Sequence, residues 1–127
     1  MKSLRIILFV VAMLCCQIVW AAPKGTILYV PLDNRPVCLS YAVATMEKAG
    51  WEVKTPPLEY IASVERGGNP DALFAWLVDN ADESLAMVIS SDALIYGGLV
   101  DSRTHNLPLE VLRARADRLV ELKKEFR

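Results

Sequence analysis

TILYV, at residues 26–30, is a continuous apolar run rich in β-branched and aromatic side chains. A second run of this kind, LAMVI, occupies residues 85–89. Strands that are apolar on both faces are typical of parallel sheets that helices cover on both sides. The two runs therefore predict buried strands of an α/β fold.

A helix and a second strand are predicted after the first strand. A helix is predicted over residues 36–49, with Pro36 at its first position and Gly50 in the left-handed conformation after its end. A brief strand at residues 51–54 follows and stops at Pro56-Pro57. These elements form one strand–helix–strand unit.

The second half repeats the alternation. A loop over residues 58–68 leads to Asn69-Pro70-Asp71, which predicts the start of a helix that runs to about residue 81. After the strand at 85–89 we expect a loop over 93–107 and a last helix from Pro108. The order is βαβαβα, an α/β fold with a parallel sheet. Because three strands make a thin sheet, we expect it to be the N-terminal part of a larger α/β domain.

Residues 1–21 are predicted to be a signal peptide, which leaves residues 22–127 as the α/β domain. Lys2 and Arg5 precede an apolar stretch at residues 6–16, and Ala21 is a small residue suited to cleavage. One alternative is a retained membrane anchor over residues 4–22, interrupted by Arg5 and Gln17. Another is lipidation at Cys15 or Cys16, although neither follows a small residue. We expect a periplasmic or secreted protein that meets the membrane only through the signal segment before cleavage.

The net charge and the cysteine content argue against nucleic-acid binding and against a disulfide-stabilised fold. The net charge of -1 offers no basic surface for nucleic acid, so we expect no nucleic-acid partner. Beyond the signal segment the only cysteine is Cys38, which excludes an internal disulfide framework. Cys38 could be a reactive thiol, but a small, buried apolar role is the favoured interpretation.

Two acidic residues follow the first and third strands. Asp33 comes directly after the first strand, and Asp92 comes after the third. Because ligands bind at the carboxyl ends of parallel strands, we expect both carboxylates at one rim. Such a pair can act as acid and base or as nucleophile and acid, so Asp33 and Asp92 are the candidate catalytic residues.

Five further residues near that rim are candidates for binding a substrate. Arg35 and Arg103 could hold an anionic or hydroxylated group through the planar guanidinium. Tyr96 could stack on a sugar face or donate its hydroxyl. Gly97 and Gly98 would let the backbone approach a ligand closely.

Each of these residues also has a structural interpretation. Asp33 can form an Asx turn or cap the next helix, and Arg35 can pair with an acid to join two loops. The segment that ends in Asp92 can be a cap, and Gly97-Gly98 can be an ordinary turn. Glu59 follows the second strand and can be a third acid of the rim, although a solvated loop position is favoured.

Several familiar sites are absent from the sequence. It contains no GxxxxGK[ST], GxGxxG or G-x-S-x-G motif, and His105 is its only histidine. We therefore expect neither a resident metal nor a cofactor. A metal bound through the oxygens of Asp33 and Asp92 stays open but has no further support.

At these segments the chain resembles a known family. The matching stretches are residues 28–36, Pro56-Pro57, residues 91–99 and Ser102-Arg103, which resemble the N-terminal part of bacterial proteins grouped as domain of unknown function 4127. Family members are several hundred residues long, so the resemblance implies a fragment. It also implies that the seven candidate site residues belong to shared motifs, without giving their roles. The family often has two acids before the arginine, whereas Asn34 stands second here and leaves Asp33 as the acid.

Three functional hypotheses follow. The first is an exported hydrolase acting on a glycan or a similar polyhydroxylated substrate, with Asp33 and Asp92 as its carboxylates. The second is an exported module that binds a small-molecule or glycan ligand without catalysis. The third is a fragment that is inactive without the rest of a longer protein.

Overall fold

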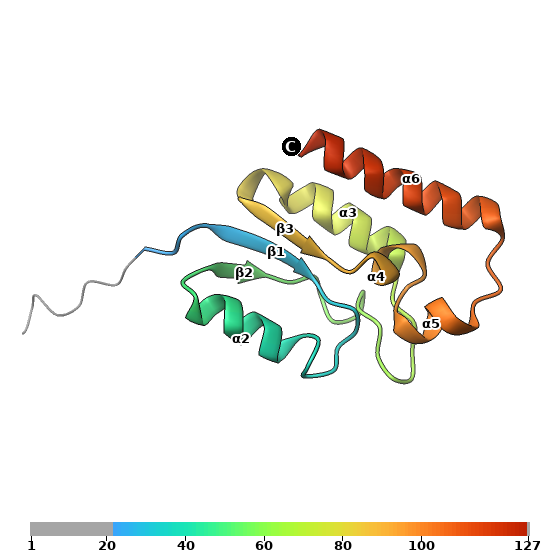
Figure 1. Ribbon diagram of the computed structural model, residues 1–127, viewed down its shortest axis with the longest axis horizontal. Coiled ribbons are helices and arrows are strands. Elements are labelled where there is room, and N and C mark those ends of the chain that lie inside the picture. The colour runs from blue at the N-terminus through green and yellow to red at the C-terminus, as the bar shows by residue number, and fades with distance from the viewer. Residues whose placement is uncertain (1–21, 127) are drawn as a thin grey trace, which may run out of the picture.

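The structure is a computed structural model that describes residues 22–126. The predicted signal peptide at residues 1–21 lies outside the described residues. Three strands, β1 (Thr26–Val30), β2 (Glu52–Lys54) and β3 (Ala86–Ile89), form one parallel sheet in the order β2-β1-β3 (Figure 1). The predicted α/β class and parallel sheet are confirmed, with β1 as the central strand.

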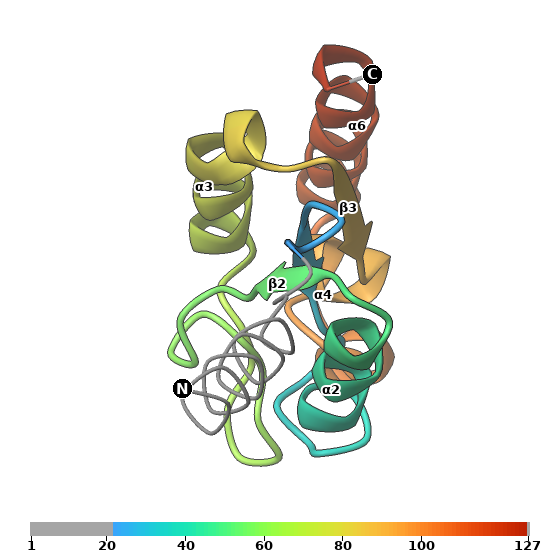
Figure 2. The same cartoon turned by 90° about the vertical axis from the view of Figure 1, so that its left-hand side faces the viewer.

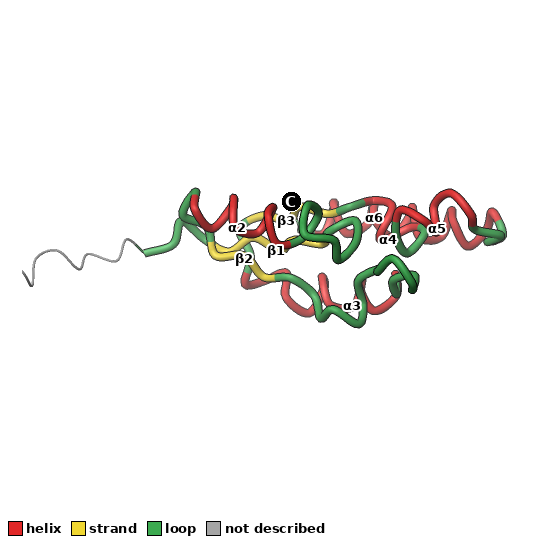
Figure 3. The backbone as a smooth tube through the Cα atoms, turned by 90° about the horizontal axis from the view of Figure 1, so that it is seen from below, coloured by secondary structure: helices red, strands yellow, loops and turns green. Residues whose placement is uncertain are grey.

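Five helices accompany the sheet in the described part of the chain. They are α2 (Ser40–Lys48), α3 (Pro70–Asn80), α4 (Ser91–Ile95), α5 (Leu99–Thr104) and α6 (Leu109–Glu125), with a short 3-10 turn, η1 (Ala81–Glu83), after α3. The views along and from below the sheet show α3 on one side of the strands and α2 on the other (Figures 2 and 3). None of these helices is both long and apolar enough to cross a membrane.

The core lies between β1 and α3. Leu28 and Val30 of β1 are fully buried against Leu73, Phe74 and Leu77 of α3. Residues from α4 and α6 complete this cluster: Ala93, Leu94 and Leu122. The spacing of the three α3 residues places them on one helical face, so burial of that face fixes α3 on the sheet.

The start of α3 confirms the predicted cap. The Asn69 side chain accepts a hydrogen bond from the Ala72 N–H at 3.1 Å, and Pro70 occupies the first turn. The predicted left-handed residue after α2 is also confirmed, because Gly50 has φ of 91°. These ends were readable from sequence because their signals are local.

The predicted start of α2 was wrong. The helix begins at Ser40 rather than at Pro36, because residues 35–39 form tight turns in which the N–H groups of Cys38 and Leu39 both donate to the Arg35 carbonyl at 2.9 Å. Arg35 is itself held by the side chain of Asp33. That local bond fixes the chain in a turn, so the helix starts about one turn later.

The loop predicted over residues 93–107 was also wrong, because it contains α5 and most of α4. The Ser90 hydroxyl caps α4 by accepting a hydrogen bond from the Ala93 N–H at 3.4 Å. Gly97 and Gly98, with φ of 104° and 153°, separate the two short helices. Each helix is too short to be stable alone, so packing stabilises them and sequence periodicity could not reveal them.

Candidate functional site

Arg35 binds the Asp33 carboxylate in the turn that follows β1. The Arg35 side chain donates from Nε to both carboxylate oxygens at 3.0 Å and from Nη2 to Oδ2 at 2.7 Å. The Arg35 backbone N–H donates to Oδ1 at 3.1 Å. Asp33 is only 6% exposed, whereas the Arg35 side chain is 45% exposed. The Asx turn at Asp33 and an ion pair of Arg35 with Asp33 are therefore both present, but this pair lies within one turn and does not join two loops.

This geometry sets the ionisation state of the site. The hydrogen bonds from Arg35 lower the pKa of Asp33, and they outweigh the opposing effect of burial. The neighbouring Cys38 thiol has a raised pKa, first because of burial and then because of Asp33. Asp33 is thus a carboxylate at neutral pH, and Cys38 is a poor nucleophile.

A small cavity opens beside this pair. Its volume is about 140 Å³, and we call it the Asp33 notch. It is lined by residues of three segments that lie far apart in the sequence: Asp33, Arg35, Ser63, Val64, Leu99 and Val100. The notch therefore presents a carboxylate, a guanidinium and a hydroxyl-bearing residue beside three apolar side chains.

Close contacts between glycines join the loops around the notch. The Gly68 N–H donates to the Gly97 carbonyl at 2.9 Å, and the Asn34 N–H donates to the Ala62 carbonyl at 2.8 Å. A Cβ at Gly98 would lie 2.5 Å from the Cβ of Ala62. Gly97 and Gly98 thus allow two loops to pack closely against each other. This close packing explains why both positions are glycine without invoking a ligand.

Other predicted site residues lie away from the notch. Asp92 is in the first turn of α4, on the same rim as Asp33, since Val30 pairs with Ile89 where the two strands end. It does not line the notch. The Tyr96 ring packs on His105 with centroids 4.9 Å apart, and Arg103 is exposed on α5. The structure therefore brings together Asp33 and Arg35 from the predicted set.

Sequence reasoning missed the residues that complete and support the notch. Ser63 and Val64 come from the loop over residues 58–68, and Arg66 orders that loop. Its guanidinium donates to four backbone carbonyls, those of Leu58, Glu59, Ile61 and Gly67, at 2.7–3.2 Å. The exposed Glu59 side chain fits the solvated loop position favoured above. No local pattern marks such long-range partners.

The Asp33–Arg35 pair is expected to make stability depend on pH. Because the folded-state pKa of Asp33 is lowered, its stabilising contribution is present above the unfolded-state value of about 3.9 and is lost as pH falls through the folded-state value. Urea unfolding of the wild type and of Asp33→Asn checks this. The variant should be less stable at neutral pH, and the difference should shrink in acid. A difference that is constant with pH would contradict the ionised pair.

Comparison with known protein families gives a match over most of the chain. The model of a family described as "Protein of unknown function (DUF4127)" matches residues 27–127. No curated protein matches the chain. No solved structure matches it either.

Proposed function

The chain belongs to the DUF4127 family, and we propose that it is an exported domain that binds a polyhydroxylated ligand, such as a sugar, in the Asp33 notch. Export rests on the basic and apolar start of the sequence and on Ala21 before the proposed cleavage. The net charge of -1 favours a ligand other than nucleic acid. Binding of a polyhydroxylated ligand is inferred from the side chains that line the notch.

The observation that supports this function is the pairing of an ionised carboxylate with a partly exposed guanidinium at a cavity wall. The fork between Arg35 and Asp33 uses Nε and Nη2. Because a guanidinium has five N–H donors, Arg35 retains donors for a ligand. The two Asp33 oxygens already accept four hydrogen bonds from Arg35, so Asp33 holds the guanidinium in place at the cavity wall. Adjacent hydroxyls of a sugar can therefore accept from the remaining N–H donors of Arg35.

Hydrolysis of such a ligand is the second candidate function. The favouring observation is that Asp33 and Asp92 lie at the carboxyl ends of neighbouring strands. The lowered pKa keeps Asp33 ionised, which suits a nucleophile or an electrostatic stabiliser rather than a general acid or a strong general base. The general acid would have to be another group, and Asp92 is the candidate on the same rim.

Saturation-transfer NMR with glucose, galactose, N-acetylglucosamine and myo-inositol tests the binding function. We expect signals from at least one of these probes with the wild type, and their loss in Asp33→Asn and Arg35→Lys. Lysine keeps the charge but cannot form the planar fork. Arg113→Lys, on the exposed surface of α6, is the matched control and should bind as the wild type does. Equal binding by all four proteins, or by none, would contradict the proposal.

Nitrophenyl glycosides separate binding from hydrolysis. Release of nitrophenol by the wild type, with loss of turnover but retained binding in Asp92→Asn, would favour the hydrolase. Binding without any release would favour the non-catalytic module. This measurement is independent of whether the Arg35→Lys variant binds, so it distinguishes the two functions directly.

A further inference from the structure

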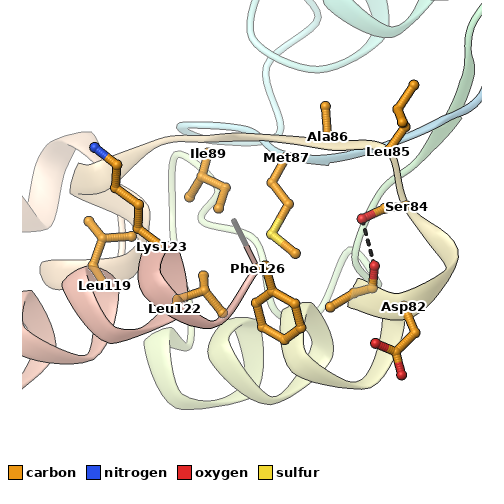
Figure 4. Close-up of a pocket in the computed structure, with 11 residues that line it drawn as sticks. Asp82, Ser84, Leu85, Ala86, Met87, Ile89, Leu119, Leu122, Lys123 and Phe126 are labelled. Atoms are coloured by element: carbon orange, nitrogen blue, oxygen red, sulfur yellow. Dashed lines mark hydrogen bonds between the residues drawn. The ribbon is translucent and has the colours of Figure 1, made fainter.

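A second and larger cavity lies along the outer edge of β3, and it shares no lining residue with the Asp33 notch. It is a groove of about 450 Å³ between β3 and the C-terminal half of α6. Its apolar wall includes Met87 and Ile89 of β3, which face Leu119, Leu122 and Phe126 (Figure 4). We call it the β3 groove. Leu122 is the one buried residue of α6, and Leu119 and Phe126 line this space beside it.

The backbone of β3 is open on the side of the groove. Among residues 22–126, β3 is an outer strand that pairs with β1 alone. The Ser90 N–H donates to the Val30 carbonyl at 2.9 Å, so the backbone groups of Ser90 face β1. Since backbone groups alternate sides along a strand, those of Val88 also face β1, and those of Met87 and Ile89 face outward. Within the part of the chain that the structure describes, the backbone N–H and C=O groups of Met87 and Ile89 therefore face the groove without a strand partner.

The helix beside this edge is held by polar contacts with other helices. Arg118 of α6 pairs with Asp71 of α3 at 2.6 Å and lies 4.3 Å from the centroid of the Phe74 ring. Arg115 donates to the Ile95 carbonyl at 2.8 Å. These contacts place α6 beside the open edge of β3 and leave the space between them unfilled. In a β-α-β unit, the connecting helix occupies this position when it leads to a further parallel strand.

The direction of the groove agrees with such a crossover. Phe126, at the end of α6, lines the groove together with Asp82 and Ser84, which precede β3. A polypeptide that leaves α6 is therefore already near the amino end of β3, where a parallel strand would begin. Asp82 and Lys123 lie toward opposite ends of the groove (Figure 4). This charge distribution fits a strand with a basic start and an acidic end.

We propose that the β3 groove is the seat of a fourth parallel strand, formed by polypeptide that follows α6. The strand pairs its backbone with the outward groups of Met87 and Ile89. Its apolar side chains pack on Leu119, Leu122 and Phe126, and its ends lie against Asp82 and Lys123. This site is independent of ligand binding at the Asp33 notch, so either proposal can fail alone.

A synthetic probe strand tests the seat. The probe is the peptide Lys-Val-Thr-Val-Thr-Val-Glu with blocked ends, and the readout is amide hydrogen exchange of the purified chain. Millimolar peptide should slow exchange at Met87 and Ile89 by about tenfold or more. A spin label at the amino end of the peptide should broaden the Ser84 amide more than the Ser90 amide. Broadening in the reverse order, or unchanged exchange, would overturn the proposal.

Variants and a tethered strand identify the occupant. Phe126→Ser should weaken protection by the peptide, whereas Val120→Ser, at a half-exposed position of the same helix, should not. The same strand fused after residue 127 through a short glycine-rich linker should protect Met87 and Ile89 at every protein concentration. Protection by the free peptide but not by the fused strand would overturn the assignment to polypeptide that follows α6. Protection that instead accompanies dimerisation of the unfused chain would show a second copy as the occupant.

Discussion

Gly68→Ala is expected to lower the free energy of unfolding by about 3 kcal/mol, because the new methyl group has no space. A Cβ at this position would lie 2.5 Å from the Gly97 carbonyl oxygen, 2.9 Å from the Tyr60 carbonyl oxygen and 3.0 Å from the Ala62 nitrogen. All three atoms belong to backbone. Relief of the overlap would require the loops around the Asp33 notch to separate, which would also break the bond from Gly68 to Gly97.

Gly67→Ala is the matched control for this change. Its Cβ would meet the Asp101 carboxylate oxygens at 2.8 and 3.0 Å, and that side chain can rotate away. We expect a loss of less than about 1 kcal/mol. Chemical denaturation of the two variants and the wild type measures both effects. Similar losses in the two variants would show that the glycine junction is not a tight contact.

Leu28→Ala is expected to cost about 3 kcal/mol, within the usual range for truncation of a buried leucine. Leu28 is 0% exposed at the centre of the central strand and packs in the cluster with Leu73 and Leu77 of α3. Its truncation leaves a cavity between the sheet and the helix. For a domain of this size the melting temperature should fall by more than about 10 °C.

Leu109→Ala controls for the loss of leucine itself. Leu109 is 58% exposed at the start of α6, so we expect a change within about 0.5 kcal/mol. Thermal and urea unfolding of both variants should rank them in this order. A mild effect at Leu28 would mean that β1 and α3 do not share the core described here.

Local signals were sufficient to predict the frame of the molecule. The continuous apolar runs predicted β1 and β3, and Asn69-Pro70 predicted the start of α3, because each signal lies within the element that it specifies. The short helices α4 and α5 could not be predicted in this way. Burial of Ala93 and Leu94 and the bond from Arg115 to Ile95 stabilise that region, and these contacts join residues far apart in the sequence.

The sequence likewise predicted only part of the candidate site, namely Asp33 and Arg35. Asp33 and Arg35 lie two residues apart after a strand, so their placement at the rim followed from the rule for parallel sheets. Their partners in the notch, Ser63 and Leu99, depend on how the loops fold back, and no spacing in the sequence shows this. The same rule correctly predicted that Asp92 lies on the same edge of the sheet as Asp33. It could not predict whether the two residues line the same cavity.

A map of backbone amide shifts during titration with the tightest-binding sugar or polyol shows directly whether the Asp33 notch is the ligand site. We expect saturable shifts concentrated at Arg35, Ser63, Val64, Leu99 and Val100, and none at the β3 groove. The Asp33→Asn variant should lose them. Saturable shifts centred elsewhere on the wild type, or none with any probe, would contradict the account.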